Sequence, residues 1–161
     1  MTHQTFSTIK NIYPISPYRE GLIKIMEDQN CDLFPTFVVN RNIRIAYAKK
    51  LVGEWLARVD HEALGRNWSK KCSSQRTFLI GFFEKPDTYL HVHAAVKLPE
   101  AGRLVSNKRL KKIWKKLIPA GSLHIVDNIR DIRKVGSYIT KDLGGRRQEE
   151  SWFLSSEFHK R

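Results

Sequence analysis

Two short apolar runs separated by a turn limit the possible folds of this chain more than any other feature. Thr77–Glu84 and Tyr89–Val96 are rich in β-branched and aromatic residues, and the second run is too short to form a helix of its own. Lys85–Thr88 between them contains proline and aspartate, two residues that favour turns. The pattern therefore predicts an antiparallel hairpin over residues 77–97.

Two histidines alternate with apolar residues in the second run. Side chains alternate between the faces of a strand, so His91 and His93 should lie on one face, about 7 Å apart. Two imidazoles so placed can bind one metal ion, although two polar residues on the wet face of a strand give the same pattern. A four-residue loop pairs Glu84 with Tyr89 and puts Glu84 on the histidine face, whereas a five-residue loop turns it away. Glu84 is therefore a candidate third ligand that depends on the hairpin register.

The rest of the chain predicts helices and strands around this hairpin. The order strand, helix, hairpin, helix, short strand, helix favours an α+β fold, with a central antiparallel sheet of about five strands and flanking helices. This layout also suits RNA-recognition folds. We expect the histidines on an inner strand and the last helix facing them. The further elements are a strand at Phe34–Arg41, a helix over Ile45–Val59, a helix capped by Ser106 and ending at Leu117, a strand at Ser122–Val126 and a helix over Asn128–Leu143 that Gly144-Gly145 ends.

The chain is long enough to form one domain around its own core, at 161 residues. We expect an N-terminal extension over 1–33 that packs on a domain over 34–145. A tail over 146–161 follows, and its apolar cluster Trp152–Leu154 either docks or frays.

Charge and cysteine content narrow the class of partner and the compartment. The net charge of +13 and the pI near 10.0 point to a polyanion, nucleic acid first and an acidic membrane surface second. Residues 1–36 carry a net charge of −1, so residues 37–161 carry +14. Cys31 and Cys72 form no disulfide framework, and no apolar stretch or secretory pattern indicates a membrane span or export. We expect reduced thiols in a cytoplasmic protein.

Three short motifs stand in a fixed order along the chain. They are Phe37-Val38-Val39-Asn40 at the end of a strand, His91-Val92-His93, and Tyr138-Ile139-Thr140-Lys141 on the last helix, where the tyrosine and lysine share a face. Together they resemble the HUH endonuclease superfamily, and within it the single-tyrosine rolling-circle replication initiators. The resemblance covers roughly residues 34–143. Conjugative relaxases place the tyrosine ahead of the histidines, whereas replication initiators and small single-tyrosine transposases share the order found here.

The resemblance implies a metal-dependent, sequence-specific enzyme that nicks and joins single-stranded DNA and initiates rolling-circle replication of a plasmid or phage. His91, His93 and the candidate ligand Glu84 would hold Mn²⁺ or Mg²⁺. Tyr138 would attack the phosphate and form a 5′-phosphotyrosine, and Lys141 would neutralise charge or lower the phenol pKa. The sequence contains no helicase domain, so a host helicase is an expected partner.

The expected substrate is single-stranded DNA or an origin hairpin, held by basic and polar side chains. Six lysines and arginines within residues 108–116 favour phosphate contacts over a merely solvated helix face. A single-tyrosine transposase and a non-catalytic nucleic-acid-binding module remain the alternatives. The residues that we predict to contact DNA are Asn40, Arg41, Lys108, Arg109, Lys112 and Lys134.

Overall fold

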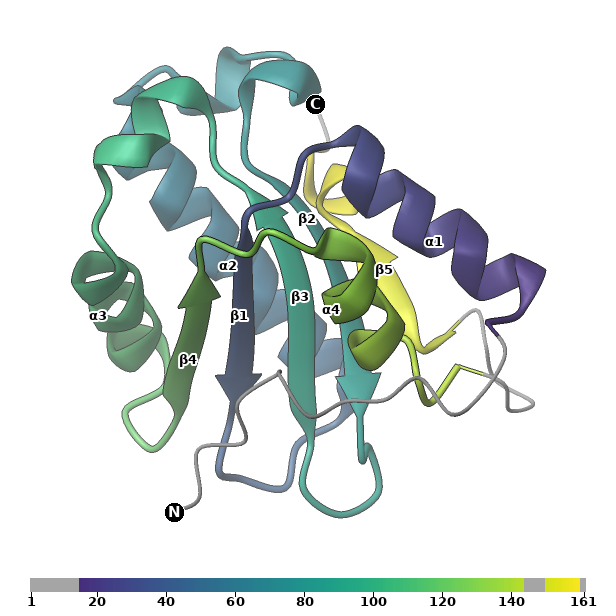
Figure 1. Cartoon of the computed structure of the whole chain (residues 1–161). Coiled ribbons are helices and arrows are strands. Elements are labelled where there is room, and N and C mark those ends of the chain that lie inside the picture. Colours follow the sequence, from purple (N-terminus) through teal and green to yellow (C-terminus); the bar gives the residue numbers. More distant parts are fainter. Residues whose placement is uncertain (1–14, 144–149, 160–161) are drawn as a thin grey trace.

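The described part of the chain forms an open five-stranded antiparallel sheet with four α-helices, which confirms the predicted α+β class (Figure 1). The computed structural model describes residues 15–143 and 150–159. The strand order is β4-β1-β3-β2-β5, so the histidine strand β3 is the central one. The strands are β1 (Leu33–Val38), β2 (Phe78–Glu84), β3 (His91–Lys97), β4 (Ser122–Asp127) and β5 (Trp152–Leu154), and the helices are α1 (Pro17–Asp28), α2 (Ile45–Leu64), α3 (Asn107–Leu117) and α4 (Ile132–Ile139).

The hairpin of β2 and β3 has a different register from the predicted one. Glu84 pairs with His91 rather than with Tyr89, and Phe82 pairs with His93, because the loop spans residues 85–90. The predicted pairing is therefore wrong by two residues. A shift of two keeps every side chain on its face, since the side-chain period of a strand is two. Glu84 consequently lies on the same face as both histidines, as predicted.

Helices cover both faces of the sheet (Figure 1). Val92, Ala94 and Val96 of β3 belong to a core shared with α2 and α3. Ala95 belongs to a second core on the opposite face, shared with α1 and α4. Since His91 and His93 have the same strand parity as Ala95, they face the α1 and α4 side.

The larger core is organised around aromatic side chains. Trp55 of α2 and Trp114 of α3 both pack edge-on against Phe37 of β1, at ring-centroid distances of 5.0 and 4.9 Å. Their indole N–H groups donate to the carbonyls of Leu110 and Val38, so the buried nitrogens are satisfied. These contacts fix α2 and α3 against the back of the strand that carries the first motif.

Two helices differ in extent from the prediction. The helix expected over Asn128–Leu143 is described as α4 only over Ile132–Ile139, where Asp131 caps it by accepting a hydrogen bond from the Lys134 amide. Asn128 has φ 53°, a left-handed conformation that cannot begin a right-handed helix. The predicted end at Gly144-Gly145 lies outside the described residues. Helix α2 extends to Leu64 instead of Val59.

Backbone conformation and tertiary contacts also set the strand ends. Strand β1 stops at Val38 rather than Arg41, because Asn40 has φ 55°. Trp152–Leu154 docks as β5 beside β2, and Phe153 is buried. The docked alternative for this cluster is thus the observed one. A 3₁₀-helix follows β5 over Ser155–Phe158, whereas residues 146–149 and 160–161 of the expected tail lie outside the described residues.

The segment predicted as an N-terminal extension contains α1, whose residues Leu22 and Met26 are buried in the second core. Residues 1–14 lie outside the described part of the chain. Among the helices that the structure describes, none is both long and apolar enough to cross a membrane.

Candidate active site

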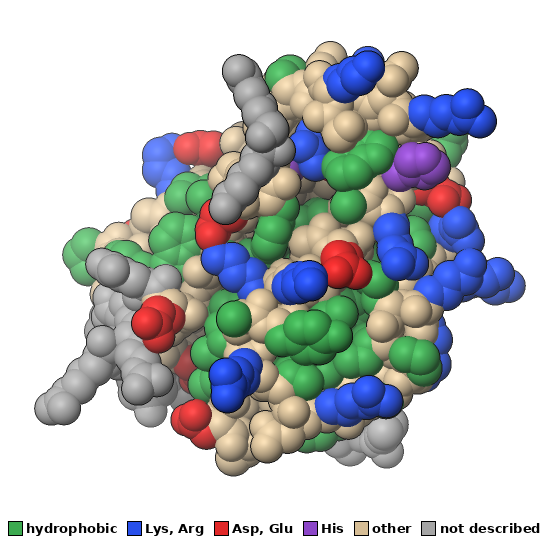
Figure 2. Space-filling model, turned by 180° about the vertical axis from the view of Figure 1, so that it is seen from behind, with side chains coloured by type: hydrophobic (Ala, Val, Ile, Leu, Met, Phe, Trp, Pro, Cys, Tyr) green, Lys and Arg blue, Asp and Glu red, His purple; other side chains and the backbone are tan. Residues whose placement is uncertain are grey.

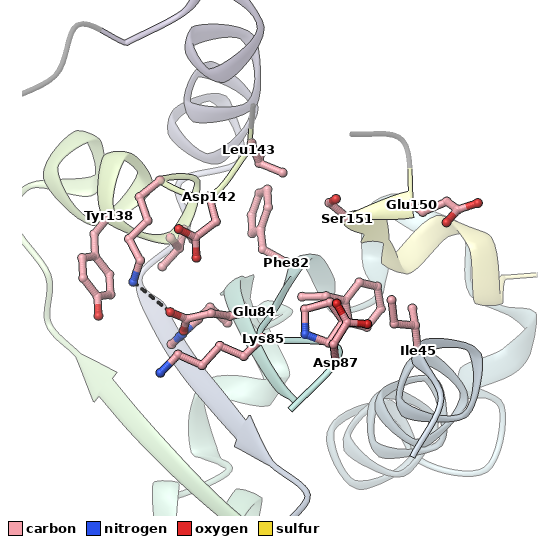
Figure 3. Close-up of a pocket in the computed structure, with 15 residues that line it drawn as sticks. Ile45, Phe82, Glu84, Lys85, Asp87, Tyr138, Asp142, Leu143, Glu150 and Ser151 are labelled. Carbon is pink, nitrogen blue, oxygen red and sulfur yellow. Dashed lines mark hydrogen bonds and ion pairs between the residues drawn. The ribbon is translucent and has the colours of Figure 1, made fainter. Parts of the chain in front are cut away.

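A pocket of about 510 Å³ opens where α4 passes over the hairpin (Figure 3). Its walls include four of the predicted site residues: Glu84 from β2, His93 from β3, and Tyr138 and Lys141 from α4 and the turn after it. His91 lies beside the pocket, with its ring centroid 6.4 Å from that of His93. The fold thus brings together residues that are up to 57 positions apart in the sequence.

Both nitrogens of His93 have partners. Its Nε2 contacts Glu84 Oε2, and its Nδ1 lies 3.0 Å from Thr36 Oγ1, which β1 presents at the paired position. A hydroxyl can donate to Nδ1 or accept from it, so Thr36 suits either tautomer of the ring. The side chains of His93 and Glu84 are each only 15% exposed. The imidazole is therefore held in one orientation, with Nε2 directed at the carboxylate.

Glu84 is a carboxylate with two cationic or hydrogen-bonding neighbours. Partial burial opposes its ionisation, but hydrogen bonds with His93 and Lys141 outweigh burial and lower the pKa of Glu84 to about 2. Lys141 Nζ lies 3.0 Å from Glu84 Oε1, the ion pair marked by the dashed line in Figure 3. Burial opposes the charge on Lys141 as well, yet the bond to Glu84 raises the pKa of its ammonium group. Both groups are therefore charged at neutral pH.

Tyr138 lies next to both the histidine and the lysine. Its ring centroid is 6.1 Å from that of His93, in an edge-on arrangement with an interplanar angle of 76°. Lys141 Nζ lies 4.1 Å from the centre of the Tyr138 ring, within the range of a cation–π contact. The single ammonium group thus contacts the phenol ring on one side and the Glu84 carboxylate on the other.

Helix α1 holds the tyrosine helix in place, mainly through Arg19. The Arg19 side chain is 9% exposed; its Nη2 donates to the Ser137 carbonyl (2.7 Å) and its Nε to Thr140 Oγ1 (3.1 Å). Ser137 and Thr140 flank Tyr138 and precede Lys141. A cation at carbonyls near a helix C-terminus also complements the helix dipole.

Close packing supports the same contact between α1 and α4. A Cβ on Gly136 would approach Ile23 at 3.1 Å and the Met26 sulfur at 3.2 Å, so α4 lies closer to α1 than a larger residue would allow. The sequence prediction missed Arg19. Its signal was present: Arg19, Leu22, Ile23 and Met26 recur at i, i+3, i+4 and i+7, which places an arginine within an apolar stripe.

Imidazole nitrogens and a carboxylate are suitable ligands for a divalent cation, but the three predicted ligands are not grouped closely enough to form a metal site. Within residues 15–143 and 150–159, no three His, Cys, Asp or Glu side chains are grouped as a metal site. Two of the three predicted donors, His93 and Glu84, are in direct contact, and His91 shares their face of the sheet. Burial, and next to it the electrostatic effect of the neighbouring His93, lower the pKa of His91, which keeps its imidazole neutral and its lone pair available.

Asn40 links three loops at the histidine end of the sheet. Its Nδ2 donates to the Ala120 carbonyl at 2.9 Å, and its Oδ1 accepts a hydrogen bond from the Tyr89 hydroxyl. Tyr89 packs edge-on against His91, at a ring-centroid distance of 4.9 Å. Arg41 follows in the same loop and is exposed. Asn40 and Arg41 therefore lie at the end of the sheet that carries His91.

The other predicted DNA contacts lie elsewhere. Lys108, Arg109 and Lys112 belong to α3, which packs on the opposite face of the sheet from α4. Arg109 is also engaged, because its Nε and Nη2 donate to the two Glu62 oxygens at 2.7 and 2.8 Å. Lys134 is half-buried in the first turn of α4. The structure does not bring the α3 residues to the pocket.

Comparisons with protein-family models, curated protein sequences and solved structures found no match to this chain. The functional assignment therefore rests on the three motifs and on the geometry of the pocket.

Proposed function

We propose that this protein is a metal-dependent enzyme that cuts and rejoins single-stranded DNA through a covalent tyrosine intermediate. The observation that carries the proposal is the meeting of Tyr138, Lys141, His93 and Glu84 in one pocket, although they come from separate elements. A nucleophilic tyrosine, a neighbouring cation and metal-binding side chains together suit phosphodiester transfer that uses no ATP. In the cell we assign it to the cytoplasm and to the initiation of rolling-circle replication.

The proposed reaction exchanges one phosphodiester bond for another. The Tyr138 hydroxyl loses its proton as its oxygen bonds to phosphorus, and the bond from phosphorus to the 3′-oxygen breaks. The leaving 3′-oxygen takes up a proton and becomes a free 3′-OH, while the 5′-phosphate stays on the tyrosine. Because the new ester retains the energy of the broken one, a 3′-OH can reverse the step and join the strands.

Each neighbour of Tyr138 has a distinct part in this proposal. A divalent ion such as Mn²⁺ or Mg²⁺, held by His91, His93 and Glu84, would polarise a non-bridging phosphate oxygen. Thr36 orients His93 through Nδ1. Lys141 is charged and lies over the phenol ring, so it would stabilise the extra negative charge of the transition state.

One observation favours a second candidate, a nucleic-acid-binding module that lacks catalysis. No three donors are grouped as a metal site in the described residues, and such a module needs none. The two candidates differ in a single property, because only the enzyme becomes covalently attached to DNA.

A denaturing gel separates the two candidates. The protein is incubated with Mn²⁺ and a labelled pool of single-stranded oligonucleotides, and we expect a labelled band that resists denaturation. Tyr138→Phe should remove the band. Tyr47→Phe is the matched control, because Tyr47 is 51% exposed on α2 and lines no part of the pocket. If no pool yields a band with the wild-type protein, the binding module is the better description.

A further inference from the structure

The positive charge of this protein is concentrated on the face opposite the pocket. Residues 45–77 and 98–121, which include α2 and α3, contain fourteen lysines and arginines and four acids. Residues 15–32 and 122–143, which include α1 and α4, contain six lysines and arginines and seven acids. The helices beside the proposed catalytic site are therefore almost neutral, and the layer behind the sheet carries most of the net charge of +13.

Ion pairs within the basic layer increase this difference. Three of its four acids are already paired with arginines of the same segments, which leaves the lysines with little local compensation. In Figure 2, which shows the molecule from behind, Lys and Arg side chains outnumber acidic ones and gather toward the side where α3 lies. The pairs are Asp60 with Arg76, Glu62 with Arg109 and Glu100 with Arg103.

Four of these basic side chains form a surface that we call the basic face: Lys108, Lys112 and Lys116 of α3, and Arg58 of α2. All four are exposed, and in the described part of the chain none of them has a hydrogen bond or an ion pair. The three lysines recur at i, i+4 and i+8, so they form a row with a step of about 6 Å along the helix axis. A groove of about 400 Å³ between α2 and α3 adjoins this row and includes Arg58 and Lys116.

We propose that the basic face binds the phosphate backbone of double-stranded DNA, separately from the single strand at the pocket. Unpaired cations on successive helical turns can contact phosphates, which follow one another at about 3.4 Å of axial rise along each strand. This binding is independent of the chemistry at Tyr138 and goes beyond the proposed function. It places duplex DNA behind the sheet, on the face opposite α4, which carries Tyr138.

The composition of α3 favours a duplex over other polyanions. Proteins that bind single strands usually offer exposed aromatic rings on which bases stack. Trp114, the single aromatic residue of α3, is 1% exposed and packs in the core. Helices that bind membranes present apolar side chains to the lipid, but the buried side chains Leu110 and Ile113 of α3 face the sheet. Trp68, which also lines the groove, is half-buried, and the Arg76 guanidinium carbon lies 4.7 Å from the centre of its ring. The outer side of α3 itself therefore offers charge without stacking or insertion.

The test compares two variants that remove the same amount of charge from opposite layers. Lys108→Gln with Lys112→Gln alters the basic face, and Lys24→Gln with Arg130→Gln is the matched control on the α1 and α4 side. Binding to a labelled blunt duplex is followed by fluorescence anisotropy between about 50 and 200 mM salt. We expect the basic-face variant to lose about two units of the slope of log affinity against log salt, and at least tenfold in affinity at about 100 mM. The control should retain both values.

Three results would overturn the proposal. The first is an equal loss in both variants, which would reflect net charge alone. The second is no measurable binding of the duplex by the wild-type protein. The third is binding to phosphatidylserine vesicles, but not to duplex, that depends on Lys108 and Lys112. Covalent adduct formation with a short single strand is measured in parallel on the wild-type protein. A missing adduct in the wild-type protein would contradict the proposed nuclease and leave the duplex measurement interpretable.

Discussion

Lys141 Nζ lies 3.0 Å from Glu84 Oε1 and 4.1 Å from the centre of the Tyr138 ring. This one ammonium group thereby links the turn after α4, the helix that carries Tyr138, to Glu84 on β2, the strand that pairs with the His93 strand β3. Its position puts a positive charge beside both the carboxylate and the phenol ring. Any strand transfer by Tyr138 should therefore depend on this lysine.

Replacing Lys141 with Gln should slow adduct formation by about a hundredfold, because the cation that would stabilise the negative charge of the transition state is lost. Single-turnover rates of the wild type and the variant measure this effect. Lys141→Arg keeps the charge and should retain a larger part of the rate, and an unchanged rate in Lys141→Gln would remove Lys141 from the chemistry.

Replacing Arg19 with Met should loosen α4 and lower the free energy of unfolding by about 1.5–3 kcal/mol, as expected for lost hydrogen bonds from a charged, buried donor. Amide hydrogen exchange should become faster in α4 before it changes in β1 and β3. Arg133→Gln is the matched control, because Arg133 also links α4 to α1 through Glu20 but is exposed. Uniformly faster exchange over the whole chain would show general destabilisation rather than release of α4.

Replacing Thr36 with Val removes the hydroxyl that contacts His93 Nδ1 and keeps the shape of the side chain. We expect Mn²⁺ to bind about 10- to 100-fold more weakly, as for other losses of a group that orients a ligand histidine. Titration of Mn²⁺ followed by calorimetry measures this without any DNA. Thr36→Ser retains the hydroxyl and should bind almost as tightly as the wild type. Equal affinity of Thr36→Val and the wild type would rule out this role for Thr36.

Glu84 should make acid stability depend on pH. Its pKa is lowered from 4.5 to about 2 in the folded protein, so folding favours the ionised form. The carboxylate therefore stabilises the fold above about pH 4.5, and this contribution disappears as the pH falls toward 2. The difference in free energy of unfolding between the wild type and Glu84→Gln should narrow over that interval. A difference that stays constant over this interval would contradict the ion pairs of Glu84.

The sequence was sufficient to predict the face on which each site residue of the hairpin lies. Side chains alternate between the two faces of a strand, so an error of two residues in the register leaves each of them on the same face. Glu84 pairs two residues away from the predicted position and still joins the histidines. Element ends were harder to predict. Asn40 and Asn128 adopt left-handed conformations that stop β1 and delay α4, and neither leaves a trace in hydrophobic periodicity.

Long-range contacts explain most of what the sequence did not reveal. Strand β5 is three residues long, and it exists because Phe153 packs over Gly81, where a Cβ would lie 2.5 Å from the ring. Arg19 carried a local signal, but its partners Ser137 and Thr140 lie more than a hundred residues away. The net charge indicated a polyanion, whereas only the fold separates the basic layer from the layer that contains the pocket.

Mass spectrometry of the protein–DNA adduct tests the central claim most directly. After reaction with single-stranded DNA and Mn²⁺, nuclease and protease digestion should leave a nucleotide attached through its 5′-phosphate to the peptide that contains Tyr138. The Tyr138→Phe protein should yield no such peptide, and the Tyr47→Phe protein should yield it at the wild-type level. An adduct on any other residue, or one that persists in Tyr138→Phe, would contradict the assignment of Tyr138 as the nucleophile.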